Sequence, residues 1–385
     1  MDIDVILKTA LDLDASDIHI KAGAPPSFRV QGVLMTVPQM PRLSAGDTET
    51  LADQMMNDVW RRKLRQDLDI DLSYSLQGYG RFRGSIFYQR GTVAITLRTI
   101  PVAVKTIRDL NLPPVLEKIS AAERGLVLVT GTTGSGKSTT LASMVDHINT
   151  TGRRNIITVE DPIEFIHRDK KSTIYQREVG WDVMSFARGL RSALREDPDI
   201  ILVGEMRDME TMETALMAAE TGHLVLSTLH TVDAVESINR IVGAFPPHQQ
   251  RQIRAQLSSI IRAIISMRLV PRADGKGRVP AVEIMIATPY VQECIRDREK
   301  TVLIHDAIAA GVSEYGMQTF DQSVFYLYKS GFITMEQAVR HSSSPDNFRL
   351  RVQGVQSTSD VALEEMEKSI DRSGPDPDQG GPKIR

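Results

Sequence analysis

Hydrophobic and polar positions follow different patterns in the two parts of the chain, and the first part covers the first hundred residues. Apolar side chains recur on one face over residues 3–13, which predicts a short helix, and residues 48–66 show similar helical spacing. Residues 18–34 indicate extended structure with a hairpin turn at residues 31–32, and residues 81–100 indicate two further strands. These elements predict a small α+β domain.

The first domain therefore covers residues 1–100. Prolines and a loss of hydrophobic periodicity then predict a linker or hinge over residues 101–114. From residue 115 onward, short apolar strands alternate with helices, which predicts a parallel sheet with crossover helices. The predicted strands are 125–129, 156–159, 200–203 and 224–227. Beyond Pro289 the pattern is mostly helical. The predicted fold class is therefore α/β, with a second domain over residues 115–355.

The last predicted helix begins at Thr334, whose hydroxyl caps it while Gln337 completes a capping box. After it, residues 356–385 combine Ser, Asp, Pro and Gly with weak hydrophobicity, which predicts a flexible acidic tail. This tail holds seven acidic and four basic residues, so it carries the whole net charge of −3. The rest of the chain is balanced, which argues against bulk-charge binding of nucleic acid or an anionic membrane.

Composition indicates a soluble globular protein, with 41% hydrophobic and 25% charged residues over 385 positions. The single cysteine, Cys294, cannot form an internal disulfide, which fits a reducing compartment. The N-terminus is acidic and lacks the pattern of a secretory signal. No apolar run approaches the roughly 20 residues needed to span a bilayer. We therefore expect a cytoplasmic protein that is not inserted in the membrane.

The strongest motif is a phosphate loop of the pattern GxxxxGK[ST], between the predicted strand 125–129 and a helix running from Thr139. Its residues are Gly131, Thr132, Thr133, Gly134, Ser135, Gly136, Lys137 and Ser138. Glycines let backbone N–H groups surround the phosphates, Lys137 can reach the β- and γ-phosphates, and Ser138 can bind Mg²⁺. The helix directs its positive end at the same anion. The motif predicts ATP and Mg²⁺ as ligands.

Acidic residues follow two of the predicted strands, at the edge where open α/β sheets bind ligands. Glu205 lies at the carboxyl end of the Walker B-like stretch 200–205, and Glu160, Asp161 and Glu164 come at the end of strand 156–159 and just after it. Such acids can hold Mg²⁺ or orient the attacking water. A solvated charge where a strand meets its loop is the alternative for each, and the nearby phosphate loop favours the functional interpretation.

Two histidines flank the strand 224–227, with His223 before it and His230 after it. Either can sense the γ-phosphate or be a hydrogen-bonded core histidine. Their spacing alone slightly favours the structural interpretation.

The motifs, taken in order, resemble the type IV pilus retraction ATPases, the PilT and PilU group of the secretion ATPase superfamily. The likeness extends from Ala15 to about Gly354. It is carried by the segments Ala15–His19, Arg81–Arg83, Leu112–Pro114, Asp161–Phe165, Asp197–Asp199, Glu205–Asp208, Thr221–His223, His230–Thr231 and Gly316–Asp321.

This resemblance implies a PAS-like N-terminal domain, a RecA-like ATPase domain and a homohexamer that works with an inner-membrane pilus platform protein. It implies that Glu164 orients or activates water and that Glu205 helps to hold Mg²⁺. His223 and His230 match the family's His box, which favours a catalytic role for both. Arg83 and Arg98 match arginines that approach the phosphates, where a fixed positive charge suits phosphoryl transfer.

One segment departs from the pattern. PilT proteins carry an Ala-Ile-Arg-Asn-Leu-Ile-Arg-Glu sequence, and Tyr290–Asp297 keeps only part of it. The tail and Gly316–Asp321 lean towards PilU, whereas Leu194–Asp199 and Glu205–Asp208 are closer to PilT.

The sequence therefore predicts an ATP-hydrolysing motor for pilus retraction. A PilU-like accessory retraction ATPase, a related assembly or secretion ATPase, a non-hydrolysing accessory subunit and a DNA-handling RecA-like ATPase are the alternatives. The balanced charge and the complete set of phosphate-loop and acidic residues disfavour the last two.

Overall fold

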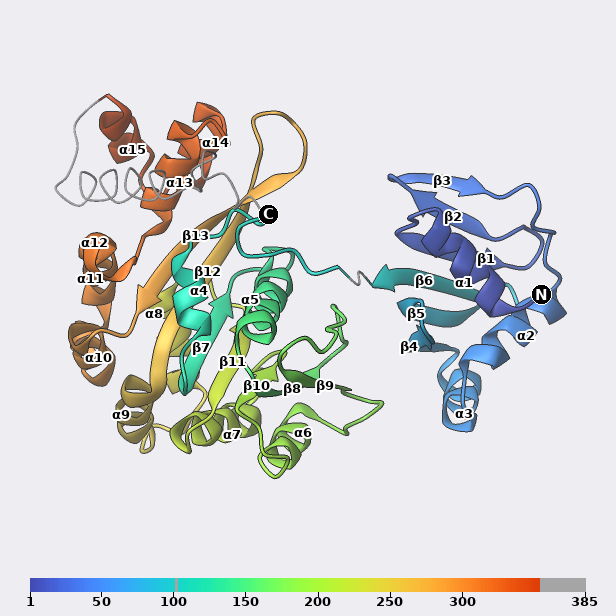
Figure 1. Cartoon of the computed structure of the whole chain (residues 1–385), viewed down its shortest axis with the longest axis horizontal. Coiled ribbons are helices and arrows are strands. Elements are labelled where there is room, and N and C mark those ends of the chain that lie inside the picture. Colours follow the sequence, from blue (N-terminus) through green and yellow to red (C-terminus); the bar gives the residue numbers. More distant parts are fainter. Residues whose placement is uncertain (101–102, 354–385) are drawn as a thin grey trace, which may run out of the picture. The chain divides into compact units, whose positions relative to one another are not determined.

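A computed structural model describes residues 1–100 and 103–353 of the chain (Figure 1). These residues form two compact units, each with its own hydrophobic core. The first unit comprises Met1–Val104 together with Pro162–Arg168. The second comprises Lys105–Asp161 and the described chain from Asp169 onward. The acidic tail predicted for residues 356–385 lies outside the described residues.

The first unit contains a six-stranded antiparallel sheet with the order β3-β2-β1-β6-β5-β4. Its strands are β1 (Asp17–Lys21), β2 (Ser27–Val30), β3 (Val33–Thr36), β4 (Asp69–Leu76), β5 (Gly80–Gln89) and β6 (Thr92–Ile100). Its helices are α1 (Ile3–Asp12), α2 (Ala45–Met55) and α3 (Asp58–Asp67). The core lies where these helices meet the sheet, with Leu7, Phe28 and Phe82 fully buried.

Most elements predicted for this unit are confirmed. The β2–β3 turn places Gln31 and Gly32 at φ 49° and 83°, the left-handed pair that matches strand twist in a tight hairpin. The helix expected over residues 48–66 is wrong as a single element. Met56 is extended and Asn57 caps a new helix, α3, by accepting a hydrogen bond from the Trp60 N–H at 2.9 Å. The short polar side chain of Asn57 therefore restarts the helix in a new direction.

The second unit is built on a seven-stranded sheet with the order β13-β12-β7-β11-β10-β8-β9. Its strands are β7 (Gly125–Thr130), β8 (Asn155–Glu160), β9 (Thr173–Glu178), β10 (Ile200–Val203), β11 (Leu224–Leu229), β12 (Ile261–Pro271) and β13 (Arg278–Ile286). All neighbouring strands are parallel except β12 and β13, which form an antiparallel hairpin at one edge. The predicted parallel sheet is confirmed, and this hairpin and β9 extend it.

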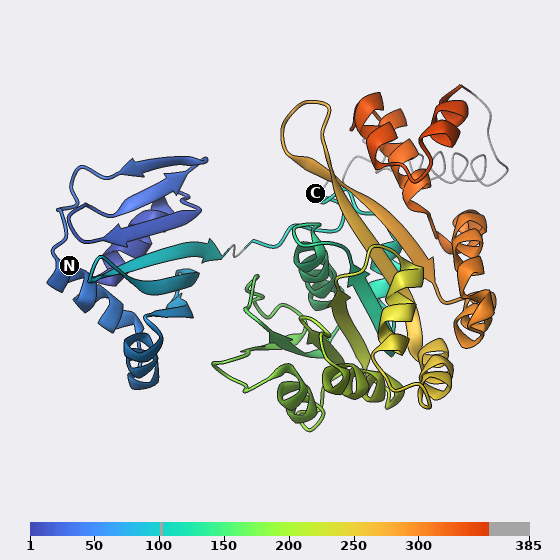
Figure 2. The same cartoon turned by 180° about the vertical axis from the view of Figure 1, so that it is seen from behind.

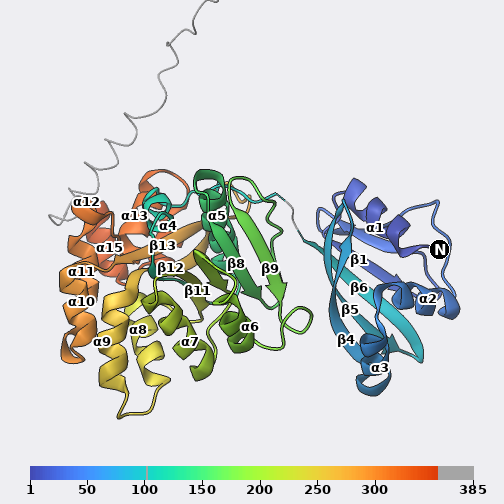
Figure 3. The same cartoon turned by 60° about the horizontal axis from the view of Figure 1, so that its bottom comes forward.

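Helices cover both faces of this sheet, as expected for a parallel sheet whose strands are apolar on both sides. One face is covered by α4 (Val115–Ser120) and α5 (Lys137–Thr151), seen in front in Figure 1. The opposite face is covered by α6 (Phe186–Ala193), α7 (Met209–Glu220), α8 (Ala234–Gly243) and α9 (Gln250–Ile260). Figure 2 shows α8 from this side, and Figure 3 shows α6 to α9 in a row.

The chain beyond the sheet is helical, as predicted. It forms α10 (Pro289–Arg296), the 3-10 helix η1 (Glu299–Leu303), α11 (Ile304–Ala310), α12 (Val312–Tyr315), α13 (Phe320–Lys329), α14 (Met335–His341) and α15 (Pro345–Val352). The last three pack over the end of the β12–β13 hairpin, where Val270, Val279 and Phe325 are buried together. No helix among residues 1–100 and 103–353 is both long and apolar enough to cross a bilayer.

Two details of these helices correct the sequence prediction. Thr334 does cap α14 by accepting the Gln337 N–H at 3.3 Å, but the Gln337 side-chain oxygen is buried without a hydrogen-bond partner in the described structure. The reciprocal bond of a capping box is therefore missing. It is present instead in α13, between Thr319 and Gln322. The helix at Thr334 is also not the last, because α15 follows it.

Candidate nucleotide site

The phosphate loop connects the buried strand β7 to α5, in the strand–loop–helix context that the motif requires. Gly131, Gly134 and Gly136 have φ values of 141°, 76° and 101°, which favour glycine. A Cβ on Gly131 would lie 2.5 Å from the Ser135 Oγ and 2.6 Å from the main-chain oxygen of Met267. The sharp loop and its close packing against β12 therefore both depend on glycine at position 131.

The hydrogen bonds of Lys137 and Ser135 indicate where the loop can accept a phosphate group. The Lys137 Nζ donates hydrogen bonds to the carbonyl oxygens of Gly131 and Thr132 at 2.8 and 3.0 Å, and the side chain is largely buried. The Ser135 Oγ is buried without a hydrogen-bond partner in the described part of the chain. A buried hydroxyl without a partner costs free energy, and a phosphate oxygen is a suitable acceptor. The loop fits a bound phosphate group.

A cavity of about 320 Å³ lies against the loop, within the second unit. Its lining residues are Gly131, Thr132, Thr133, Gly134, Ser135, Val232, Met267, Arg268, Leu269, Arg278 and His341. None of these residues is acidic, and two are arginines. A cavity with this charge selects anions, although the chain before the tail is balanced in charge. Sequence reasoning missed Arg268, Arg278 and His341, because β12, β13 and the end of α14 reach the loop only through the fold.

Glu205 lies just beyond β10, on the same edge of the sheet as the phosphate loop. Its position is fixed by β11, whose Thr228 hydroxyl donates to the Gly204 carbonyl at 2.6 Å, and by the Met206 N–H, which donates to the Thr228 carbonyl at 3.3 Å. Its carboxylate contacts the Arg207 Nε at 2.8 Å and the His230 Nε2 at 3.2 Å. The structure therefore brings Glu205 and His230 together.

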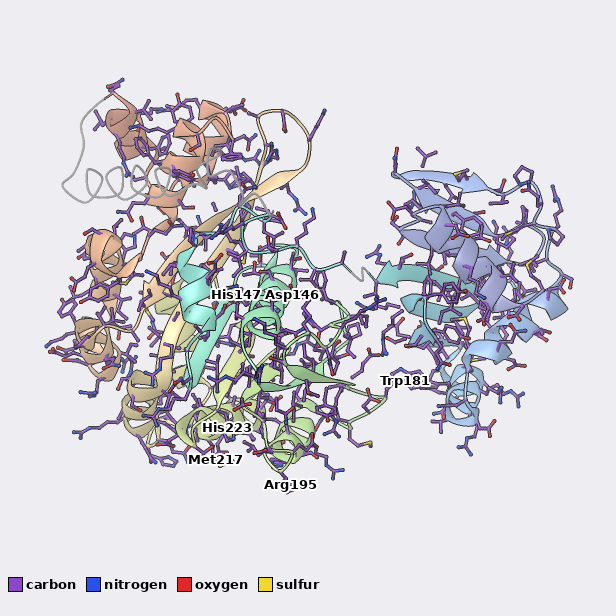
Figure 4. All side chains as sticks on the ribbon, in the orientation of Figure 1. Asp146, His147, Trp181, Arg195, Met217 and His223 are labelled. Carbon is purple, nitrogen blue, oxygen red and sulfur yellow. The ribbon has the colours of Figure 1, made fainter. Side chains whose placement is uncertain are left out.

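His223 lies at the amino-terminal end of β11, whereas the phosphate loop and Glu205 lie beyond the carboxyl-terminal ends of β7 and β10. It precedes β11, whereas His230 follows it, so a whole strand of roughly 20 Å separates the two side chains. Figure 4 shows His223 on the same lower edge as Met217 and Arg195. Its Nδ1 lies 2.9 Å from the Ala218 carbonyl oxygen and 3.2 Å from the Thr221 Oγ1. Within one chain, the fold does not bring His223 to the phosphate loop.

The acids after β8 have different surroundings. The Glu160 carboxylate accepts hydrogen bonds from the Thr158 hydroxyl at 2.6 Å and the Gln176 amide at 3.2 Å, so β8 and β9 hold it. Asp161 and Glu164 are both exposed. Glu164 belongs to the segment Pro162–Arg168 of the first unit, so its role at the nucleotide stays a prediction.

Arg83 and Arg98 lie opposite each other on β5 and β6, on the same face of the first unit's sheet. Arg98 also faces Asp17 on β1 and bonds its carboxylate through Nε at 3.0 Å. Burial favours a higher pKa for Asp17, but hydrogen bonds from Ser16 and Arg98 outweigh it and lower the pKa below its usual value. Both arginine side chains are exposed. Their action on a nucleotide stays a prediction.

These side chains can support phosphoryl transfer. The loop supplies inward-facing N–H groups and a lysine for phosphates, and hydroxyl and carboxylate oxygens are the ligands that Mg²⁺ prefers. Ser138, half-buried in the first turn of α5, and Glu205 are the candidates for such ligands, and Thr139 follows in the same turn. The donor types therefore fit Mg²⁺.

The chain is similar to known proteins in both sequence and structure. Residues 1–307 match the family model described as "Type II/IV secretion system protein". The chain is 45% identical to the pilus retraction ATPase PilT of Pseudomonas aeruginosa, over 90% of this chain and 100% of PilT. It is 39% identical to the type IV pilus ATPase PilU of the same organism, over the full length of both. A crystal structure of the retraction motor PilT with bound ADP matches with a TM-score of 0.82 and 48% identity, covering 90% of this chain and 98% of that one.

Proposed function

Because this chain belongs to the Type II/IV secretion system protein family, we propose that it is an ATP-hydrolysing motor that drives retraction of type IV pili. The observation that carries the proposal is the complete phosphate loop on β7 and α5, with Glu205 and His230 at neighbouring strand ends. The likeness to PilT over 90% of this chain supports the proposal that the protein acts on the pilus.

In this proposal, the phosphate loop binds the β- and γ-phosphates of ATP. Lys137 exchanges its bonds to the loop carbonyls for phosphate oxygens, and the Ser135 hydroxyl gains an acceptor. Ser138 and Glu205 hold Mg²⁺, directly or through water. Mg²⁺ held there would supply positive charge that stabilises the negative charge developing during phosphoryl transfer.

The remaining residues have roles in hydrolysis that follow from their chemistry. Glu164 orients or activates the attacking water, and His230 lies beside Glu205, where it can respond to the γ-phosphate. Arg83 and Arg98 supply positive charge to the transition state. Because His223 lies a strand's length from its own loop, its proposed action is on a nucleotide other than the one bound by its own loop.

We propose that the chain works as a homohexamer on the cytoplasmic side of the inner membrane, together with a pilus platform protein. Residues 101–114 act as the hinge between the two units, and ATP binding, hydrolysis and ADP release change their arrangement. Ile107 and Leu112, in the second half of this segment, are buried in the core of the second unit.

The first test compares Mg²⁺-dependent phosphate release by the purified full chain and by two variants. Lys137→Ala removes the phosphate-binding amine and Glu205→Gln removes the carboxylate charge, so each is expected to reduce turnover at least about 100-fold. Lys276→Ala, at the exposed tip of the β12–β13 hairpin, is the control and keeps full turnover. Unchanged turnover in Lys137→Ala would refute the proposed activity.

A PilU-like accessory motor is the second candidate, because the alignment with PilU spans both chains completely. A deletion strain separates the possibilities. Loss of a retraction motor leaves excess pili, loss of an assembly motor leaves none, and loss of an accessory motor leaves retraction that is weakened but present. Counting pili per cell and measuring twitching motility in the same strain distinguishes these results.

A further inference from the structure

The cavity at the phosphate loop is lined on one side by the loop itself and elsewhere by residues from other parts of the chain, which we call the second wall. This wall comes from three elements: β12 gives Met267, Arg268 and Leu269, β13 gives Arg278, and the end of α14 gives His341. No residue of the phosphate-loop motif belongs to it. The wall is therefore a separate structure that faces the phosphate-binding site.

The composition of this wall differs from that of a phosphate site. Met267, Leu269 and the neighbouring Val232 are apolar, and they lie among two guanidinium groups and an imidazole. A triphosphate needs N–H groups and positive charge, and it gains nothing from apolar neighbours. A nucleobase needs apolar contacts and a planar partner for its ring, and arginine stacks well on aromatic faces. The wall suits the nucleoside end of a nucleotide.

Two of these side chains, Arg278 and His341, have no partner among the described residues. Within residues 1–100 and 103–353, neither the Arg278 nor the His341 side chain forms a hydrogen bond or an ion pair. Arg268, by contrast, lies over the Phe320 ring with its guanidinium carbon 3.9 Å from the ring centroid. Arg268 is thus anchored, whereas Arg278 and His341 are available to a ligand.

The backbone fixes where this wall stands. β12 runs parallel to β7 with Ser266 opposite Thr130, so Met267 and Arg268 lie just beyond the start of the loop. Arg278 pairs with Pro271 at the far end of the β12–β13 hairpin. The Thr140 hydroxyl on α5 donates to the Met267 sulfur at 3.1 Å, which ties β12 to the helix after the loop. A nucleotide held by the loop therefore has this wall beside it.

We propose that Arg278 and His341 bind the base and ribose of the nucleotide and are specificity-determining residues of this site. This proposal rests on the proposed ATPase function. Arg278 stacks on the base between the apolar side chains, and His341 hydrogen-bonds a ribose hydroxyl. Burial, with Arg340 and Arg268 nearby, lowers the pKa of His341, so at neutral pH its imidazole is neutral and can both donate and accept.

The test compares two probes by calorimetry on the full chain: a non-hydrolysable ATP analogue, and tripolyphosphate, which has the phosphates without base or ribose. Arg278→Ala and His341→Ala are each expected to weaken binding of the ATP analogue about 5- to 10-fold and to leave tripolyphosphate binding within about twofold. Arg272→Ala is the matched control, because Arg272 lies on the same hairpin, pairs with Asp274 at 2.9 Å and does not line the cavity.

Two results would overturn the proposal. The first is unchanged affinity for the ATP analogue in both variants, and the second is an equal loss for both probes, which would mean that the wall binds phosphate. Lys137→Ala separates this proposal from the function on which it rests, because it should weaken both probes. If Lys137→Ala binds both probes as tightly as the natural chain, the loop is no phosphate site and the proposed function fails.

Discussion

Glu283 carries a carboxylate into the interior of the second unit. The side chain is 3% exposed, and its carboxylate accepts a hydrogen bond from the Ala234 N–H at 3.0 Å, at the first residue of α8. It lines a small cavity of about 140 Å³ that also includes Asp233, Arg268 and His305. Burial raises the pKa of Glu283 to about 6, because the low-dielectric interior disfavours the charged form and the Ala234 bond offsets only part of this effect.

This pKa predicts how stability depends on pH. Because the folded-state pKa lies above the unfolded value of 4.5, the folded state binds this proton more tightly. The resulting stabilisation is complete below pH 4.5 and is lost as the pH rises through 6. Glu283→Gln does not titrate, so its stability relative to the natural chain should rise by about 2 kcal/mol between pH 4.5 and 7.

Urea unfolding of both proteins at pH 4.5, 5.5 and 7 measures this difference. Glu213→Gln, which alters an exposed carboxylate on α7, is the control and should show no such trend. A constant difference between Glu283→Gln and the natural chain across this range would contradict the prediction.

At the scale of elements, α7 depends on a single side chain for its start. Asp208 accepts the Thr211 N–H and the Thr211 hydroxyl, both at 2.9 Å, and its negative charge lies at the positive end of the helix. α7 begins six residues after β10 ends, and Glu205 lies between them. Asp208 therefore fixes the end of the loop that contains Glu205, at the point where this loop joins α7.

Asp208→Ala is expected to lower the free energy of unfolding by about 1 kcal/mol, the usual contribution of an N-cap. Asp208→Asn keeps the acceptor and should lose less than half as much. Thermal unfolding followed by circular dichroism measures both variants, and equal stability of Asp208→Ala and the natural chain would show that the cap contributes nothing.

At the scale of the whole molecule, the cores of the two units share no residue. The first core is built from residues 3–97, whereas every core residue of the second unit lies at position 107 or later. All residues that line the cavity at the phosphate loop also belong to the second unit. We therefore expect that folding of the second unit and its binding of nucleotide do not require the first hundred residues.

A chain that begins at Lys105 is expected to fold and to bind ATP within about tenfold of the full chain's affinity, a loss of at most about 1.4 kcal/mol. Its turnover should be lost, because Arg83 and Arg98 are absent. Calorimetry and phosphate release measure these two properties. If this chain folds cooperatively but does not bind ATP, the cavity residues alone are insufficient.

Local patterns in the sequence predicted most of the elements. The buried strands of the parallel sheet are continuous apolar runs, and their periodicity identifies them without tertiary information. β4 was missed, although Ile70, Leu72, Tyr74 and Leu76 alternate with polar residues and gave a usable signal. The capping pattern at Thr334 and the one at Thr319 are alike in sequence. The structure shows the reciprocal bond at Thr319 and not at Thr334.

The sequence by itself determined the phosphate loop, because the loop needs glycines, a lysine and a serine at fixed spacing along one stretch of chain. It also predicted that the acids after strands 156–159 and 200–203 share an edge, since parallel strands end on the same side of the sheet. The same rule places His223, which precedes β11, at the opposite ends of the strands. Only the tertiary structure brought Arg268, Arg278 and His341 to the loop. These three lie more than a hundred residues beyond it, and strand order and helix packing, which no local pattern specifies, bring them to the same cavity.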